Sequence, residues 1–401
     1  MFFERIISNT IKKATETFPV VLITGPRQVG KTTVFEQYRE AGRTYVTLDD
    51  PQVRVLAQND PALFLQTYKT PLFIDEIQYA PQLFPYIKMV VDREKQKGMF
   101  WLTGSQQFHL MRNVSESLAG RVAILQLQGL SQAEKFHRKN PPFLPDNEEK
   151  TNHTLGINQI YELILRGSYP ELYANPSVDL DLFYSSYLKT YIEKDIRDLI
   201  NISDESAFIK FIKVAAACTG QLLNYSNMAS DVGVSVPTIK AWLSLLETSG
   251  LTFMLYPYAN NFINRAVKTP KLYFYDTGLV CYLCGWVSAI TLQNGAMNGA
   301  ILETYVISEI LKSYQYNGKS VNAYFYRDKE KKEIDLLIER NGTFFPIEIK
   351  RTASPKEGDV KSFNVLKYRN LPVGKGAIIC FYENFLPLNR EVNIVPISYL
   401  G

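Results

Sequence analysis

The sequence has few cysteines and no long apolar run, and both absences exclude classes of protein. Four cysteines in 401 residues are too few to form a disulfide framework. No apolar stretch approaches the ~20 residues that a membrane-spanning helix needs. Residues 1–5 lack the basic and then apolar order of a secretion signal. We therefore expect a cytoplasmic protein that does not enter a membrane.

The sequence also lacks a strong excess of charge of either sign. It has 44 lysines and arginines against 40 acidic residues, and the net charge of +4 is too mild to indicate nucleic-acid binding by itself. Cys281 and Cys284 form one C-x-x-C pair, but no second pair or histidine cluster accompanies it, so we expect no zinc site. The length predicts two or three domains with ordinary apolar cores.

A phosphate-binding P-loop pattern is the most informative motif that is present. Its residues are Gly25, Pro26, Arg27, Gln28, Val29, Gly30, Lys31 and Thr32, followed by Thr33. An apolar stretch typical of a strand precedes it and a helix-compatible stretch follows, which is the context that the motif requires. The glycines let backbone N–H groups turn toward phosphate oxygens. Lys31 is expected to reach the β- and γ-phosphates of ATP, and Thr32 to ligate Mg²⁺.

Strand and helix patterns alternate after the P-loop. Residues 45–48, 72–74 and 99–103 are expected to form strands, and residues 81–97 a helix. Such alternation predicts a parallel sheet covered by helices, with ligands at the carboxyl ends of the strands. Residues 1–150 are therefore expected to form an α/β P-loop core.

Two acidic residues follow the apolar strand at 72–74, as in a Walker B motif. We expect Asp75 to hold Mg²⁺ through water and Glu76 to orient or deprotonate the attacking water. An Asp-Glu pair at a strand end is ordinarily a solvated turn or a helix cap. The P-loop upstream favours the catalytic interpretation here.

Two further positions are expected to act on the γ-phosphate. Ser105 follows the strand at 99–103 and suits the sensor-1 role, because it places a small polar side chain beside the phosphate. The transferred group also needs a positive charge, for which Arg121 is the first candidate and Arg166 the second. A surface ion pair is an equally open interpretation of Arg121. The sequence does not decide whether either arginine acts in cis or in trans.

The segment after the core is expected to be helical and to lead into a helix-turn-helix. Residues 151–202 are interpreted as a helical lid, and residues 203–262 as a winged-helix domain. Ser235 is expected to cap the second helix of the pair, and a strand pair near residues 253–256 is expected to form the wing. That helix offers only Thr238, Lys240 and Ser244 to DNA. Protein binding and a role as a rigid spacer therefore remain open beside DNA binding.

Residues 263–401 contain the second candidate site, on a predicted β-hairpin. Asn341-Gly342 between two alternating stretches is a strong signal for a two-residue turn. That register places Asp335 opposite Glu348 and Glu333 opposite Lys350, with the apolar residues on the other face. Pro346 lacks an N–H group and indicates an edge strand or a bulge.

Two facing carboxylates destabilise a hairpin unless a positive charge joins them. Lys350 supplies part of that charge, and a divalent cation would supply it better, because hard cations prefer carboxylate oxygens. The alternative is a surface salt bridge between Glu333 and Lys350. Both interpretations stay open at this point.

Several segments together resemble the AAA-type ATPases of prokaryotes that carry a C-terminal domain of unknown function. The segments are residues 25–33, 72–78, 102–106, 118–121, 167–171, 275–279 and 302–305. The resemblance covers nearly the whole chain and implies ATP binding with slow hydrolysis.

The C-terminal part separately resembles the PD-(D/E)XK nuclease fold, in the order of Asp335, Glu348 and Lys350. By that resemblance Asp335 and Glu348 would hold Mg²⁺ or Mn²⁺. Lys350 would orient water or stabilise the transition state, and Glu303, on the preceding helix, would complete the site.

We therefore expect an α/β P-loop NTPase core with a helical lid, then a winged-helix domain and a small restriction-endonuclease-like α/β domain. The expected function is Mg²⁺-dependent ATP binding with slow hydrolysis, coupled to a C-terminal module that contacts nucleic acid or protein. An ATP-gated nuclease and a non-hydrolysing nucleotide-dependent scaffold are the alternatives. An oligomer is implied if Arg121 acts in trans.

Overall fold

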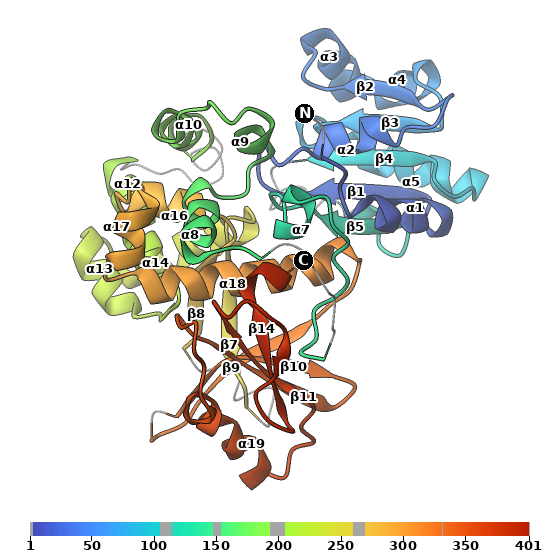
Figure 1. Cartoon of the computed structure of the whole chain (residues 1–401). Coiled ribbons are helices and arrows are strands. Elements are labelled where there is room, and N and C mark those ends of the chain that lie inside the picture. The colour runs from blue at the N-terminus through green and yellow to red at the C-terminus, as the bar shows by residue number, and fades with distance from the viewer. Residues whose placement is uncertain are drawn as a thin grey trace.

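The computed structural model arranges the chain around two β-sheets with helices beside and between them (Figure 1). It describes residues 3–104, 114, 116–146, 154–192, 205–259, 269–330 and 332–400. One sheet has five strands and the other nine. The long helix α18 (Asn298–Tyr316) passes close to both, because it contacts β5 of the first sheet and β8 and β11 of the second.

The N-terminal sheet is parallel throughout, in the order β2-β3-β4-β1-β5. Its strands are β1 (Val20–Thr24), β2 (Thr44–Thr47), β3 (Leu72–Asp75), β4 (Phe100–Gly104) and β5 (Val122–Gln126). Every residue of β1, β3 and β4 is buried, as expected for central strands covered on both faces. The parallel α/β core predicted from the sequence is confirmed.

Short helices cover this sheet and connect its strands. They are α1 (Ser8–Thr17), α2 (Lys31–Gln37), α3 (Pro51–Asn59), α4 (Pro61–Thr67), η1 (Ile77–Tyr79) and α5 (Leu83–Glu94). Asp50 caps α3 and Asp60 caps α4, each followed by proline in the first helical turn, a combination that fixes a helix start. Because all five strands are parallel, their carboxyl ends lie together at one end of the sheet, where the P-loop begins.

Helices dominate the next part of the chain. They are α7 (Gln132–Lys135), α8 (Ile157–Arg166), α9 (Pro170–Ala174), α10 (Leu180–Tyr187), η2 (Leu188–Ile192) and α12 (Glu205–Ala217). The helical character expected across residues 161–192 is confirmed. Tyr169, Tyr184 and Tyr187 are buried and pack against one another with Phe183, so aromatic packing holds α9 and α10 together.

A pair of helices and three short strands follow α12. They are β6 (Gln221–Leu222), α13 (Tyr225–Val232), α14 (Val236–Thr248), β7 (Thr252–Pro257) and β8 (Lys271–Phe274). Ser235 caps α14 as predicted, since its side chain accepts from Thr238 N at 3.2 Å. β8 pairs in antiparallel fashion with both β6 and β7. The boundary expected between residues 262 and 263 therefore separates two strands that pair with each other.

The C-terminal part extends the same sheet. Its other elements are α16 (Thr277–Leu283), α17 (Ala289–Asn294), β9 (Asn322–Arg327), β10 (Glu333–Arg340), β11 (Thr343–Ile349), η3 (Glu357–Phe363), α19 (Asn364–Tyr368), β12 (Gly376–Cys380), β13 (Leu386–Pro387), β14 (Val392–Pro396) and η4 (Ile397–Tyr399). The strand order is β13-β14-β12-β11-β10-β9-β7-β8-β6. β7 joins β9 in parallel, with Tyr256 beside Tyr324.

The β10–β11 hairpin has the predicted register. Arg340 pairs with Thr343 and Leu336 with Ile347, and Asn341 and Gly342 form the turn with φ of 52° and 76°. Positive φ at both turn residues is the signature of a type I′ turn. The hairpin, its turn and its register are confirmed from Leu336–Ile347 to Arg340–Thr343. The expected pairing of Asp335 with Glu348 and of Glu333 with Lys350 lies beyond the end of this ladder, where Ile349 N donates to the Asp335 side chain.

Pro346 does not mark an edge strand, so that expectation is wrong. β11 lies between β10 and β12, and Pro346 is opposite Leu337. The N–H groups of Phe344 and Lys350 point away from β10, to Pro372 O and Ile379 O. The nitrogen of Pro346 points the same way by alternation, and pairing with β12 begins only at Ile347. The missing donor therefore costs no ladder hydrogen bond.

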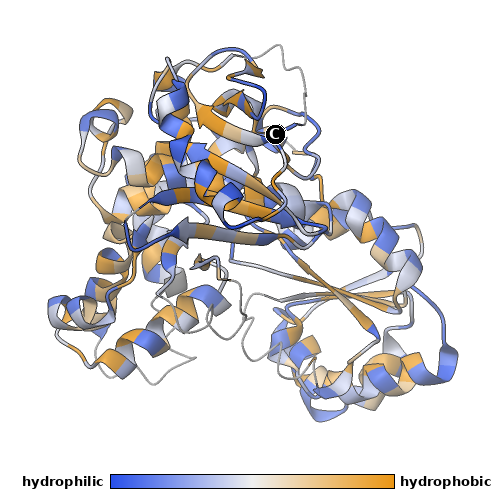
Figure 2. Cartoon of the chain, turned by 90° about the horizontal axis from the view of Figure 1, so that it is seen from below, coloured by the Kyte–Doolittle hydropathy of each residue, from blue (hydrophilic) through white to orange (hydrophobic). Residues whose placement is uncertain are grey.

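One apolar core runs from the first sheet into the second. It includes Val21 of β1, Ile160 of α8, Leu246 of α14, Ile307 of α18 and Ile347 of β11. Figure 2 shows the apolar colour concentrated along the strands and on the inner faces of helices. None of the helices in the described part of the chain combines the length and apolar character that a membrane crossing requires.

Candidate functional site

The P-loop connects the carboxyl end of β1 to α2, as the motif requires. Gly25 has φ of 146°, and a Cβ there would lie 2.0 Å from Leu127 O. Gly30 has φ of 89° and immediately precedes α2. Both positions therefore require glycine, Gly25 for lack of space and Gly30 for its left-handed backbone.

Lys31 and Thr32 begin α2 and point in different directions. Lys31 is buried, and its Nζ donates to Gly25 O at 3.0 Å and to Pro26 O at 2.8 Å. The ammonium thus lies against the carbonyl groups of the loop. Thr32 Oγ1 donates to Asp75 Oδ1 at 2.9 Å, although the two residues are 43 apart in sequence. The structure brings the two predicted Mg²⁺ ligands together.

Glu76 adopts an unusual backbone conformation directly after β3. Its φ of 55° and ψ of 46° are left-handed, which is strained for a residue with a side chain. Its N–H donates to Thr103 Oγ1 at 3.2 Å, and its carboxylate accepts a hydrogen bond from Gln78. The predicted general base is thus held by contacts on both its backbone and its side chain.

Thr103 is a site residue that the sequence reasoning missed. β4 lies between β1 and β3 in the sheet, so the end of β4 lies between the P-loop and Asp75. The buried Thr103 hydroxyl there donates to Asp75 Oδ1 as well as accepting from Glu76 N. Its position as a polar residue near the end of a buried apolar strand was the available signal. Ser105, the predicted sensor, lies outside the described residues.

Tyr45, on β2, is a second residue that the sequence reasoning missed. Its hydroxyl lies 3.4 Å from Asp75 Oδ2. Burial, and next the negative charge of Asp75, raise the pKa of Tyr45 to about 12. Tyr45 therefore stays a hydrogen-bond donor to Asp75 at neutral pH.

Arg121 lies far from the P-loop of its own chain. It precedes β5, whose first residue pairs with Val20 at the start of β1. Arg121 is therefore at the end of the sheet where the strands begin, opposite to the P-loop. The length of β1 then separates it from the P-loop by roughly 13 Å. Its guanidinium is exposed and pairs with Asp92 at 2.5 Å and 3.1 Å. This position is incompatible with a contact in cis. The exposed pair with Asp92 matches the alternative interpretation of Arg121 as a surface ion pair, and a contact in trans stays a prediction.

Arg166 ends α8 and is half-buried. Its Nη1 donates to Leu172 O at 2.8 Å, so this donor binds the backbone of α9. Whether Arg166 acts on nucleotide stays a prediction.

The hairpin register brings Asp335 and Glu348 together in the second sheet. Ile349 N donates to Asp335 Oδ2 at 2.8 Å, and Lys350 Nζ lies 2.6 Å from Glu348 Oε1. Burial, and next the charges of Glu303 and Glu348, raise the pKa of Asp335 well above its ordinary value. Burial also raises the pKa of Glu348, although Lys350 opposes this effect. The four predicted residues therefore lie close enough to influence one another.

Lys271 of β8 is a member of this site that the sequence reasoning missed. Its Nζ lies 3.0 Å from Glu303 Oε1 and 2.6 Å from Glu333 Oε1. Tyr273 OH also donates to Glu303, at 2.5 Å. We call Glu303, Glu333, Asp335 and Glu348 the carboxylate cluster. Lys271 is its most buried cation, with 5% of the side chain exposed, against 40% for Lys350.

The predicted alternative of a Glu333–Lys350 salt bridge is wrong. Glu333 pairs with Lys271 and, at 3.4 Å, with Arg327. The physical reason is burial, because an ammonium as enclosed as that of Lys271 requires nearby carboxylates. Lys350 is left to pair with Glu348.

The two sites differ in how well they suit a divalent cation. The Thr32 hydroxyl and the Asp75 carboxylate are hard oxygen donors that suit Mg²⁺. In the carboxylate cluster, Lys271 and Tyr273 already engage Glu303. Within the described ranges, no three His, Cys, Asp or Glu side chains have the arrangement of a metal site. Because Lys271 and Tyr273 engage Glu303, the cluster is less suited to a divalent cation than the Thr32–Asp75 pair.

Comparison with family models divides the chain into three matches. Residues 17–136 match the AAA domain. Residues 157–289 match the domain of unknown function DUF8612, and residues 298–400 match the domain of unknown function DUF4143. The AAA match contains both the P-loop and Asp75. Together with the parallel sheet, it supports a P-loop ATPase domain of the AAA type that binds nucleotide.

Two curated relatives extend over nearly the whole chain. They are the uncharacterized proteins Mb2031c of Mycobacterium bovis and Rv2008c of Mycobacterium tuberculosis. Each is 29% identical over 388 residues, which is 96% of this chain and 82% of the relative.

Solved structures show only a weak likeness. The Walker-type ATPase PABY2304 of Pyrococcus abyssi is 14% identical with a TM-score of 0.43, over 70% of this chain and 96% of that one. A single-residue variant of RuvB of Thermotoga maritima is 18% identical with a TM-score of 0.28, over 62% of this chain and 86% of that one. These TM-scores are too low to establish a shared fold.

Proposed function

We propose that this chain is a Mg²⁺-dependent ATPase whose nucleotide state controls its C-terminal module. One observation carries the proposal, the hydrogen bond of 2.9 Å between Thr32 and Asp75. It joins the end of the P-loop to the end of β3 and creates a pair of oxygen donors beside the expected phosphates. This arrangement supports hydrolysis as well as binding.

Each residue of the site has a role in this proposal. Thr32 and Asp75 would hold Mg²⁺, which supplies positive charge to the phosphate oxygens when bound. Lys31 would exchange the carbonyl groups of Gly25 and Pro26 for phosphate oxygens. Glu76 would orient a water molecule and accept its proton. Ser105 is kept as the proposed sensor.

Phosphate release by purified protein tests the ATPase. Glu76→Gln should lower turnover about 100-fold or more while leaving nucleotide bound. The matched control is Glu94→Gln, which changes a glutamate paired with Arg93 on α5. Bound nucleotide without turnover in the wild type would instead favour the non-hydrolysing scaffold. Turnover that survives Glu76→Gln would refute the role of Glu76.

We further propose that α12 to β8 form a winged helix that binds nucleic acid or protein. The element order and the β6–β8–β7 pairing support this interpretation. Lys240, an exposed basic residue of α14, lies 5.3 Å from the Tyr225 ring and is the basic side chain that α14 offers to a phosphate. DNA binding that weakens steeply with salt would support nucleic acid as the partner. Its absence would favour a protein.

An ATP-gated nuclease in residues 263–401 is the second candidate. It is favoured by the opposed Asp335 and Glu348 and by Glu348 Oε2, a buried atom without a hydrogen-bond partner in the structure. It is disfavoured by Lys271, which neutralises part of the cluster. Labelled DNA and RNA incubated with Mg²⁺ or Mn²⁺, with and without ATP, test it. Asp335→Ala should abolish cleavage, whereas Glu330→Ala, an exposed partner of Lys332, should not.

We also propose a cytoplasmic setting, on the sequence grounds given above, and an oligomer in the presence of ATP. The oligomer follows only if Arg121 acts on nucleotide, because from its place beside Asp92 it could contact nucleotide only across an interface with a second copy. Measurement of the molecular mass with and without ATP tests it.

A further inference from the structure

Arg5 is a buried arginine that holds the back of the P-loop. It precedes α1 and is only 3% exposed. Its Nη1 donates to Val29 O at 2.7 Å, and its Nη2 donates to Gln128 O at 2.8 Å. One guanidinium thus connects the P-loop to the segment that follows β5, and its planar group of donors suits such a double contact.

The contact with Val29 O sets the direction of an N–H group. Val29 C=O and Gly30 N–H belong to the same planar peptide, and in a trans peptide they point in opposite directions. With the oxygen bound to Arg5, the Gly30 N–H points away from Arg5, toward the inside of the loop. Backbone N–H groups inside a P-loop are the ones that bind phosphate oxygens. Arg5 therefore prepares the loop for phosphate.

Arg5 is itself held by Glu134 of α7. Its Nε lies 3.0 Å from Glu134 Oε1, and both side chains are buried. Glu134 also accepts from Ile6 N and from Ser131 N, each at 2.9 Å. The carboxylate is therefore fixed by three donors, and Arg5 has little freedom to rotate.

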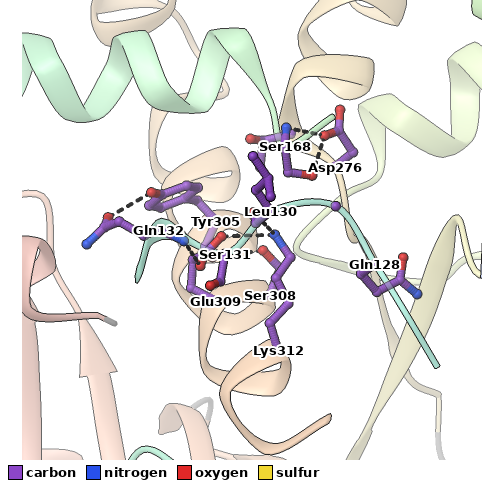
Figure 3. A network of polar contacts seen from close by, with 12 residues as sticks. Gln128, Leu130, Ser131, Gln132, Ser168, Asp276, Tyr305, Ser308, Glu309 and Lys312 are labelled. Carbon is purple, nitrogen blue, oxygen red and sulfur yellow. Dashed lines mark hydrogen bonds and ion pairs between the residues drawn. The ribbon is translucent and has the colours of Figure 1, made fainter. Parts of the chain in front are cut away.

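Helix α18 completes the surroundings of Arg5. The Arg5 guanidinium lies 5.4 Å from the centre of the Tyr316 ring, and Tyr316 OH donates to Gly129 O. One and two turns earlier in α18, Lys312 Nζ donates to Leu130 O at 3.3 Å and Glu309 Oε2 accepts from Gln132 N at 2.6 Å. Figure 3 shows the side chains of Glu309 and Lys312 pointing toward residues 130–132.

Residues 128–134, the segment that follows β5, are also bound by Ser168, which follows α8. Leu130 N donates to Ser168 O at 2.6 Å, and Ser168 N and Oγ donate to Asp276 Oδ2 at 2.6 Å and 2.7 Å (Figure 3). Residues 128–134 are thus enclosed between the back of the P-loop and parts of the chain beyond the AAA match.

We propose that Arg5 is a positioning residue of the nucleotide site, and that α18, through Tyr316, controls how firmly Arg5 holds the Val29–Gly30 peptide. The nucleotide affinity of the P-loop then depends on the seating of the C-terminal region. This inference rests on the proposed nucleotide function and names its regulation.

Hydrogen exchange of the nucleotide-free protein tests the positioning. Arg5→Gln should speed amide exchange in a peptide covering residues 25–35 by about tenfold, because one charge-assisted contact is lost. Thr17→Val is the matched control, since the exposed Thr17 Oγ1 donates to Lys13 O at 2.7 Å within α1 and its hydrogen bond involves neither Tyr316 nor the P-loop. Unchanged exchange in Arg5→Gln, or an equal effect of Thr17→Val, would overturn the proposal.

Arg5→Gln leaves Glu134 buried without its cation and so risks misfolding. Two further variants avoid this difficulty. Arg5→Gln combined with Glu134→Gln removes both charges and should still speed exchange in residues 25–35. Arg5→Lys keeps a cation beside Glu134 but cannot also bridge Val29 O and Gln128 O. If the role were only structural, Arg5→Lys would restore slow exchange, and that result would overturn the proposal.

Binding of a fluorescent ATP analogue to the full chain tests the control by α18. Arg5→Lys should raise its Kd about tenfold, and Tyr316→Leu about threefold to tenfold, because the ring beneath the guanidinium is lost. Thr17→Val should leave the Kd unchanged. Normal wild-type binding with an unchanged Kd in both variants would overturn this inference alone. If the wild-type chain bound no analogue, the proposed function would fail together with it.

Discussion

Lys271 and Glu303 form an ion pair, with Nζ and Oε1 3.0 Å apart, in which the lysine is buried and the glutamate half-buried. The lysine comes from β8 and the glutamate from α18, so the pair joins the strands after α14 to the long helix. Its ammonium also reaches Glu333. One lysine thus supplies the buried positive charge of a cluster of four acids.

Replacement of Lys271 by methionine should destabilise the protein. The half-buried carboxylates of Glu303 and Glu333, 16% and 28% exposed, would lose this ammonium, although Glu333 keeps Arg327 and Glu303 keeps Tyr273. Loss of a contact with a charged group typically lowers the free energy of unfolding by about 1–3 kcal/mol. Urea unfolding measures the change. Lys332→Met is the control, because Lys332 forms an exposed pair with Glu330 and should have no measurable effect. Equal stability of Lys271→Met and wild type would contradict the buried ion pair.

The stability of the protein should fall as the pH rises above about 4. The folded-state pKa of Asp335 is raised above 3.8, so the folded chain retains a proton that the unfolded chain has lost. Stability from this group is complete below the unfolded pKa and disappears as the pH passes through the folded pKa. Urea unfolding near pH 5 and near pH 8 should show this loss in wild type and a smaller one in Asp335→Asn. The same slope in both proteins would speak against a raised pKa at Asp335.

Thr103→Val should impair hydrolysis more than binding. The change keeps the shape of the side chain but removes its hydrogen bonds to Asp75 and Glu76. Loss of such a supporting contact commonly lowers activity about 10-fold to 100-fold. Phosphate release and analogue binding measure the two effects separately, with Thr44→Val, an exposed threonine at the start of β2, as control. A rise in Kd with unchanged kcat would exclude a supporting role in hydrolysis.

Gly25→Ala should abolish nucleotide binding. A Cβ at Gly25 would lie 2.0 Å from Leu127 O, so the loop or the segment after β5 must move. Gly42→Ala is the matched control, because Gly42 also has a positive φ, 107°, but no atom lies within 4 Å of a Cβ there. Comparison of the two separates steric displacement of the loop from backbone strain. Equal affinities in both variants would mean that the loop tolerates the displacement.

Features that depend on a few consecutive residues were predicted correctly from the sequence. The P-loop, the Ser235 cap and the Asn341-Gly342 turn each depend on a few consecutive residues, and the structure has all three in the expected place. The hairpin register followed because the turn type leaves only one pairing. Only the interpretation of Pro346 as a mark of an edge strand failed, since the cost of a missing N–H depends on which neighbour the nitrogen faces.

Contacts between distant residues could not be predicted. Arg5 lies 129 residues from Glu134 in sequence, and Lys271 is 32 residues from Glu303. A single sequence contains no signal for such pairs, because their distance is set by how whole sheets and helices pack. Arg121 shows the opposite difficulty. The residues around Arg121 suggested a role at the phosphate, but only the pairing of β5 with β1 reveals that Arg121 lies at the opposite end of the strands from the P-loop.

The parallel pairing of β7 with β9 has a mechanical consequence. Tyr258 N donates to Phe325 O at 2.7 Å, and β8 lies between β6 and β7. The strands that follow the α13–α14 pair and the strands that carry the carboxylate cluster therefore belong to one hydrogen-bonded sheet. Rotation of one part against the other would break backbone hydrogen bonds. A chain cut at residue 262 would lose the strand that β6 and β7 share, and with it Lys271.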